Sequence, residues 1–100
     1  MYALPGAVLF RFGTYFYHEG EFVKAGYCLD MAAERPGPWQ PKAMLLLGKT
    51  LEALGNDEDA IHLYQAVTEQ YPDSAFQTAA LEKLAAIPGL RSGSTNSHLS

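Results

Sequence analysis

The sequence predicts an all-α protein built from antiparallel helix–turn–helix repeats, with about five helices. The first observation is that apolar and small residues recur at i, i+3, i+4 and i+7 over 44–72, on both sides of a break at Leu54-Gly55-Asn56. The second is that this pattern also occurs 35 residues earlier. Leu9, Phe12, Gly13, Phe16, Gly20, Ala25, Leu29 and Ala32 correspond to Met44, Leu47, Gly48, Leu51, Gly55, Ala60, Tyr64 and Val67. Similarity at a fixed period is typical of repeat proteins.

The first helix is expected over 6–18, with Pro5 near its start, where the missing N–H costs nothing. Apolar and aromatic residues surround this helix, and a helix that is hydrophobic on every side is expected to be covered on every side. Two explanations remain open. The helix is central in a tight fold, or its outer face meets another chain or a ligand. The residues concerned are Val8, Leu9, Phe10, Phe12, Tyr15, Phe16 and Tyr17.

Turn and capping residues delimit the other helices. Gly55 suits the left-handed position that ends a helix, and Asn56 is expected to cap the next one. Ser74-x-x-Gln77 has the form of a capping box. The expected ranges are 21–34, 41–54, 57–71 and 75–87.

The repeated pattern resembles the signature of the tetratricopeptide repeat (TPR) family. It reads Leu9-x2-Phe12-Gly13-x2-Phe16, Gly20, Ala25, Leu29, Ala32, and then Met44-x2-Leu47-Gly48-x2-Leu51, Gly55, Ala60, Tyr64, Val67, Pro72. The resemblance covers roughly 6–87 and implies a TPR-like α-solenoid. A single domain is expected at 1–90, with repeat one at about 6–40, repeat two at about 41–74, a capping helix at about 75–87 and a flexible tail at 91–100. The first repeat is one residue longer than the second, through Pro36-Gly37-Pro38-Trp39.

Composition excludes several functional classes. The net charge of −4 and the lack of a basic stripe argue against general nucleic-acid binding. The single cysteine, Cys28, excludes an intramolecular disulfide and a multi-cysteine metal site, and we expect it to be a buried thiol. Arg11 interrupts the first apolar run, so neither a membrane span nor a signal peptide is expected there. The sequence as written favours a cytoplasmic location. A periplasmic or cell-envelope location is the alternative if the chain is an excised domain.

No catalytic constellation is present in the sequence. His18, His62 and His98 fall in different elements, and no HExxH, GxSxG, Walker or GxGxxG motif occurs. The acidic run at 57–59 is explained by its place at a helix start, where the helix dipole favours negative charge. We therefore expect no enzyme activity, no cofactor and no metal site.

The TPR resemblance implies a concave groove, lined by the first helix of each pair, that takes an extended peptide or a partner's helix. Three of the four lysines fall on this expected surface of an acidic protein, which suits a partner with acidic and apolar anchors. The alternative is that these lysines are ordinary solvated charges. The expected groove residues are Phe10, Thr14, Tyr17, Lys42, Leu45, Lys49, Phe76 and Lys83, with His18, Glu52 and Ala79 beside them.

Two functional hypotheses follow from these patterns. The first is a non-enzymatic protein–protein interaction module. The second is a self-assembling structural or scaffold subunit, a homodimer or a stack formed through the aromatic first helix, in a setting such as a bacterial cell-envelope complex. Binding of a chaperone's C-terminal tail is not expected, because Thr14 and Lys49 stand where TPR proteins of that kind carry an asparagine.

Overall fold

The computed structural model describes residues 4–87, and this part of the chain contains five α-helices and no strand. Each helix begins and ends within one residue of its predicted position, so the all-α prediction is confirmed. The predicted flexible tail, 91–100, lies outside the described residues. The helices are α1 (Gly6–His18), α2 (Phe22–Ala33), α3 (Gln40–Ala53), α4 (Asp57–Gln70) and α5 (Ala75–Ala86).

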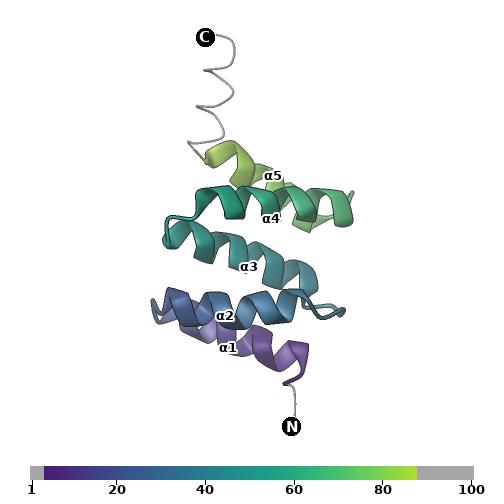
Figure 1. Ribbon diagram of the computed structural model, residues 1–100. Coiled ribbons are helices and arrows are strands. Elements are labelled where there is room, and N and C mark those ends of the chain that lie inside the picture. Colours follow the sequence, from purple (N-terminus) through teal and green to yellow (C-terminus); the bar gives the residue numbers. More distant parts are fainter. Residues whose placement is uncertain (1–3, 88–100) are drawn as a thin grey trace.

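The five helices form an antiparallel array in which each packs on the next (Figure 1). Helices α1, α3 and α5 also contact one another in sequence, so they form one layer, and α2 and α4 form the other. In a curved array, alternate helices come close to one another on the concave side. The layer of α1, α3 and α5 is therefore the inner layer. Helices α1 and α5 lie at opposite ends.

A small residue brings the two helices of each repeat together in the same way. A Cβ atom on Gly13 of α1 would lie 2.5 Å from the side chain of Leu29 in α2. A Cβ atom on Gly48 of α3 would lie 2.4 Å from the ring of Tyr64 in α4. Leu29 and Tyr64 are both fully buried. The two helix pairs are therefore built on one contact, which supports the repeat inferred from the 35-residue shift.

The inter-helix turns depend on glycine. Gly20 and Gly55 have φ angles of +79° and +84°, and a Cβ atom would meet nothing within 4 Å at either position. Backbone conformation alone therefore requires glycine at these two positions.

The predicted caps had different outcomes. The Ser74 hydroxyl accepts a hydrogen bond from the Gln77 backbone N–H at 3.1 Å, as the capping box predicted. Asn56 occupies the N-cap of α4, but its side chain makes no capping hydrogen bond, so that prediction is wrong. Ser74 is extended, at φ −133° and ψ 164°, whereas Asn56 has φ −95° and ψ 63°, away from the conformation usual for a capping side chain.

Trp39 fixes the longer connection between the repeats. Its indole N–H donates to the Ala32 carbonyl at 3.2 Å, and its ring lies over Gly6, where a Cβ atom would be 2.4 Å away. The adjacent Gln40 amide donates to the Ala33 carbonyl at 2.8 Å. The additional residue of the first repeat is therefore accommodated around a packed tryptophan that joins α1, α2 and α3.

Candidate functional site

The predicted lysines of α3 lie on the inner layer and face solvent. Lys42 and Lys49 are exposed, and Leu45 between them is half-buried. Within residues 4–87 the structure records an ion pair for neither lysine. The seven-residue separation places the two lysines on one face of α3, about 10 Å apart along the helix axis.

The predicted aromatic residues of the inner layer are half-buried and packed against neighbouring rings. Tyr17 of α1 makes an edge-to-face contact with Phe22, with ring centroids 5.6 Å apart. Phe76 of α5 makes a similar contact with Tyr71 at 6.2 Å. Half-burial leaves part of each ring on the surface, as it does for Phe10. The Thr14 hydroxyl donates to the Phe10 carbonyl at 2.8 Å, so its hydrogen atom is used within α1.

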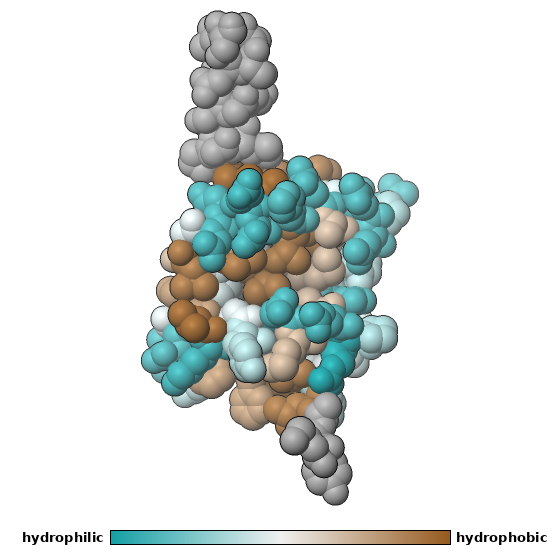
Figure 2. Space-filling model, in the orientation of Figure 1, coloured by the Kyte–Doolittle hydropathy of each residue, from teal (hydrophilic) through white to brown (hydrophobic). Residues whose placement is uncertain are grey.

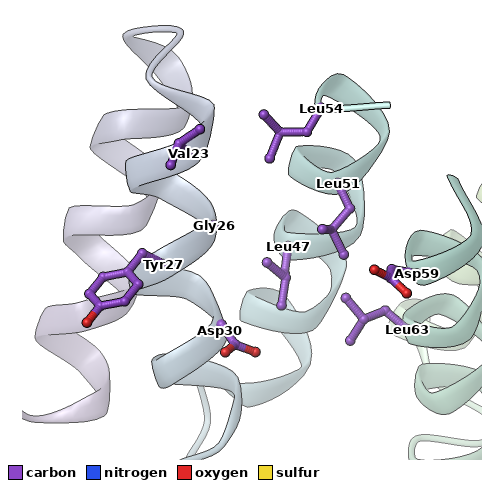
Figure 3. A pocket seen from close by; sticks show the side chains of 9 residues that line it. All are labelled: Val23, Gly26, Tyr27, Asp30, Leu47, Leu51, Leu54, Asp59 and Leu63. Atoms are coloured by element: carbon purple, nitrogen blue, oxygen red, sulfur yellow. The ribbon is translucent and has the colours of Figure 1, made fainter. Parts of the chain in front are cut away.

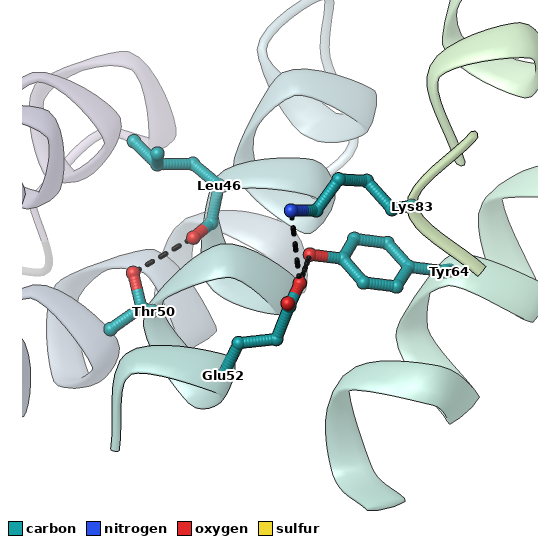
Figure 4. A network of polar contacts seen from close by, with 5 residues as sticks. All are labelled: Leu46, Thr50, Glu52, Tyr64 and Lys83. Atoms are coloured by element: carbon teal, nitrogen blue, oxygen red, sulfur yellow. Dashed lines mark hydrogen bonds and ion pairs between the residues drawn. The ribbon is translucent and has the colours of Figure 1, made fainter. Parts of the chain in front are cut away.

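The third predicted lysine, Lys83, is half-buried and forms an ion pair within the chain (Figure 4). Its Nζ lies 3.3 Å from the Glu52 carboxylate, and the Tyr64 hydroxyl donates to the same carboxylate oxygen at 2.5 Å. This network joins α3, α4 and α5. Burial, followed by the hydrogen bond to Glu52, raises the pKa of Tyr64, so this phenol remains a donor. Of the three lysines predicted for the groove, Lys42 and Lys49 are therefore the two whose charge is open to a partner.

An apolar hollow of about 450 Å³, the outer hollow, lies on the opposite side of the array, between α2 and α4 with α3 as its floor (Figure 3). Apolar residues gather in the middle of this face between hydrophilic borders (Figure 2). In Figure 3, Val23 of α2 and Leu54, the C-cap of α3, lie at the same end of the hollow. The lining residues are Val23, Gly26, Tyr27, Asp30, Leu47, Leu51, Leu54, Asp59 and Leu63.

The outer hollow combines exposed apolar surface with acidic groups. Val23 and Tyr27 are 73% and 72% exposed, which is high for apolar side chains beside a cavity. Asp30 of α2 and Asp59 of α4 are exposed, and no ion pair is recorded for either in the described range. Sequence reasoning missed this surface. The available signal was the spacing of Val23 and Tyr27, one helical turn apart and out of phase with the buried Ala25, Leu29 and Ala32.

A second hollow, of about 520 Å³, lies on the end face of α1. Phe12 and Tyr15 are 47% and 57% exposed there, so α1 is not covered on every side. The explanation that α1 is central in a tight fold is wrong, because α1 is a terminal helix of the array. The lining residues are Val8, Arg11, Phe12, Tyr15 and Phe16.

Other classes of site find no support in residues 4–87. No helix described in this range is long and apolar enough to cross a membrane. The described residues also bring together no group of three or more metal-ligating His, Cys, Asp or Glu side chains. Cys28 is half-buried rather than buried, and desolvation raises the pKa of its thiol. A raised pKa reduces the thiolate fraction and with it the reactivity of the group.

Comparison with known proteins supports the repeat assignment. Residues 42–74 match the tetratricopeptide repeat family model. No curated protein and no solved structure gave a significant match. Tetratricopeptide repeats are generally protein–protein interaction modules and are typically non-enzymatic, so the chain is expected to have a protein partner. The chain thus contains a match to the tetratricopeptide repeat family at 42–74, and the five-helix array around it is consistent with a TPR-like repeat protein.

Proposed function

We propose that this chain is a non-enzymatic module that binds a peptide or helix of a partner protein on its inner layer. The observation that carries the proposal is the pair of exposed lysines on one face of α3, with no ion pair recorded for either. Half-buried aromatic residues lie on the two flanking helices, Tyr17 on α1 and Phe76 on α5. This combination offers charge at the centre and apolar surface on both sides.

The spacing of the lysines restricts the partner. Lys42 and Lys49 are about 10 Å apart along α3, and a polyproline II peptide advances about 3.1 Å per residue with three residues per turn. Carboxylates three residues apart in a peptide of this extended form, or seven apart in a helix, match this distance and lie on one face. Apolar side chains beside the carboxylates would meet the flanking aromatic residues. The proposed partner segment therefore carries acidic residues at i and i+3, or at i and i+7, with apolar residues between them.

Reversing both charges, Lys42→Glu with Lys49→Glu, is expected to weaken such binding by tenfold or more, because two attractions become repulsions. The probes are synthetic peptides with aspartate at i and i+3 and leucine between, and their Kd is measured by fluorescence anisotropy. Lys24→Glu reverses a single charge on α2 and is the matched control for Lys42→Glu alone. Binding should also weaken in high salt. If the double variant keeps its helical circular dichroism spectrum and binds these peptides like wild type, the assignment to the inner layer is wrong.

The outer hollow supports a second candidate, binding of a segment that carries an apolar side chain next to a lysine or arginine. The specific observation is the exposure of Val23 and Tyr27 beside the two carboxylates of Asp30 and Asp59. Exposed apolar patches bordered by polar groups commonly mark interaction sites. The two candidate surfaces require partners of opposite charge, so one set of peptides distinguishes them.

Replacing Asp30 and Asp59 with lysine is expected to reduce binding of leucine-and-arginine peptides by tenfold or more, while leaving binding of acidic peptides unchanged. Glu34→Lys with Glu69→Lys, at exposed positions that do not line the hollow, is the matched control for net charge. Anisotropy titrations of both peptide types against the three proteins measure the effect. Equal loss with the control variant would show that only the net charge of the protein matters and would exclude the hollow as a site.

A further inference from the structure

The end face of α1 carries the second hollow, and the equivalent surface of α3 in the second repeat is covered by another helix. Shifted by 35 residues, the exposed Phe12 and Tyr15 and the half-buried Val8 correspond to positions on α3 that are buried. Ala43 and Leu47 of α3 share a core with Ala25, Leu29 and Ala32 of α2. Each α3 residue is therefore covered by the preceding helix, and no described helix precedes α1. The corresponding pairs are Val8 with Ala43, Phe12 with Leu47 and Tyr15 with Thr50.

At the other end of the array, the outer face of α5 is also less polar than a typical protein surface. Leu81 is 52% exposed, and Glu82 is the one charged residue among the exposed positions of this helix. A terminal helix that only caps a repeat array needs a polar outer face. The exposed residues of α5 are Ala75, Thr78, Leu81, Glu82, Ala85 and Ala86.

The two end faces are complementary in size and charge. The α1 face presents large rings around a hollow, whereas the α5 face presents mostly small side chains with one leucine. In the same way, α2 places two alanines and a leucine against α3. Arg11 lines the hollow on α1, and Glu82 is exposed on α5. In residues 4–87 neither is recorded in an ion pair, whereas the adjacent Lys83 is paired with Glu52.

We propose that copies of this chain associate end to end, with the outer face of α5 docked on the end face of α1 in a second copy. Leu81 enters the aromatic hollow, and Glu82 pairs with the Arg11 guanidinium. Because the two faces differ and lie at opposite ends (Figure 1), the contact is heterologous and extends into an open stack. This association uses the end faces of α1 and α5, and neither the inner-layer residues Lys42 and Lys49 nor the outer hollow, so it is independent of the proposed partner binding.

Charge exchange tests the pairing. By light scattering, wild type should show a molar mass that rises with concentration above the 10.9 kDa of one chain. Arg11→Glu alone and Glu82→Arg alone should each shift this rise to at least tenfold higher concentration. The double variant carries the exchanged pair and should restore association. An equimolar mixture of the two single variants should also associate, as an alternating stack, because every contact between unlike variants joins one basic and one acidic side chain.

Other outcomes would overturn the proposal. If Arg11→Glu reduces the mass, Glu82→Arg does not, and the double variant is not rescued, the contact is α1 against α1 in a closed dimer. A wild type that keeps the mass of one chain at all concentrations excludes self-association through these faces. Circular dichroism of each variant confirms folding, and because both residues are exposed, their replacement should leave the helical content unchanged.

Discussion

Replacing Tyr64 with alanine is expected to lower the free energy of unfolding by about 3–5 kcal/mol, the cost of removing a large buried aromatic side chain. Tyr64 is fully buried, packs on Gly48 and hydrogen-bonds Glu52, so its loss leaves a cavity between α3 and α4. Small proteins are stable by only about 5–15 kcal/mol. The variant should therefore lose much of its stability, as measured by urea denaturation followed by circular dichroism.

The Tyr64→Phe variant separates the contribution of the ring to stability from that of the hydroxyl. The phenylalanine variant keeps the packing but loses the hydrogen bond to Glu52, and this should cost about 1 kcal/mol. Glu52 keeps its partner Lys83 in this variant. A Tyr64→Ala variant no less stable than Tyr64→Phe would show that the ring contributes nothing and would contradict the packing of α4 on α3.

The stability of wild type and that of Tyr64→Phe should respond differently to alkaline solution. The pKa of Tyr64 is raised in the folded protein, first by burial and then by the Glu52 carboxylate. Its contribution to stability is fully present below the unfolded-state pKa of about 10. As the pH rises further, the unfolded chain releases the phenolic proton while the folded chain retains it, so stability falls by up to about 1.4 kcal/mol per pH unit from this group. Tyr64→Phe should lose stability less steeply over this range, and equal slopes would contradict the raised pKa.

Helix positions could be predicted because local rules determine them. Gly55 adopts the left-handed conformation and Ser74 forms its cap, as the sequence indicated. Asn56 differs because residue type alone does not determine backbone conformation. Its backbone N–H donates to the Leu51 carbonyl at 2.7 Å in the preceding turn, and its side chain makes no cap.

The candidate sites were less predictable because they depend on contacts between helices. The sequence places Lys83 on the groove side of α5 but cannot show that Glu52 lies within reach on α3. Likewise, periodicity indicates that α1 is apolar on all sides, but not that it is terminal. The outer hollow requires three helices to be placed together, so the spacing of Val23 and Tyr27 within α2 indicates exposed apolar surface but does not predict the hollow.

Replacing Gly48 with alanine is expected to lower the free energy of unfolding by up to about 2 kcal/mol, although alanine favours a helix over glycine by about 1 kcal/mol. The new Cβ would lie 2.4 Å from the Tyr64 ring, which is buried and hydrogen-bonded and so cannot move away cheaply. Overpacking of this kind costs about 1–3 kcal/mol and outweighs the gain in helix propensity.

Gly26→Ala in α2 is the matched control, because a Cβ atom there meets Thr50 at an ordinary 3.7 Å. That variant should be more stable than wild type by up to about 1 kcal/mol, since propensity acts alone. Urea denaturation of the two variants therefore isolates the effect of the clash. If Gly48→Ala is as stable as Gly26→Ala, then close approach of α3 and α4 is not what requires glycine at position 48. If the two differ in sign as expected, the packing of Gly48 on Tyr64 determines how closely these helices approach.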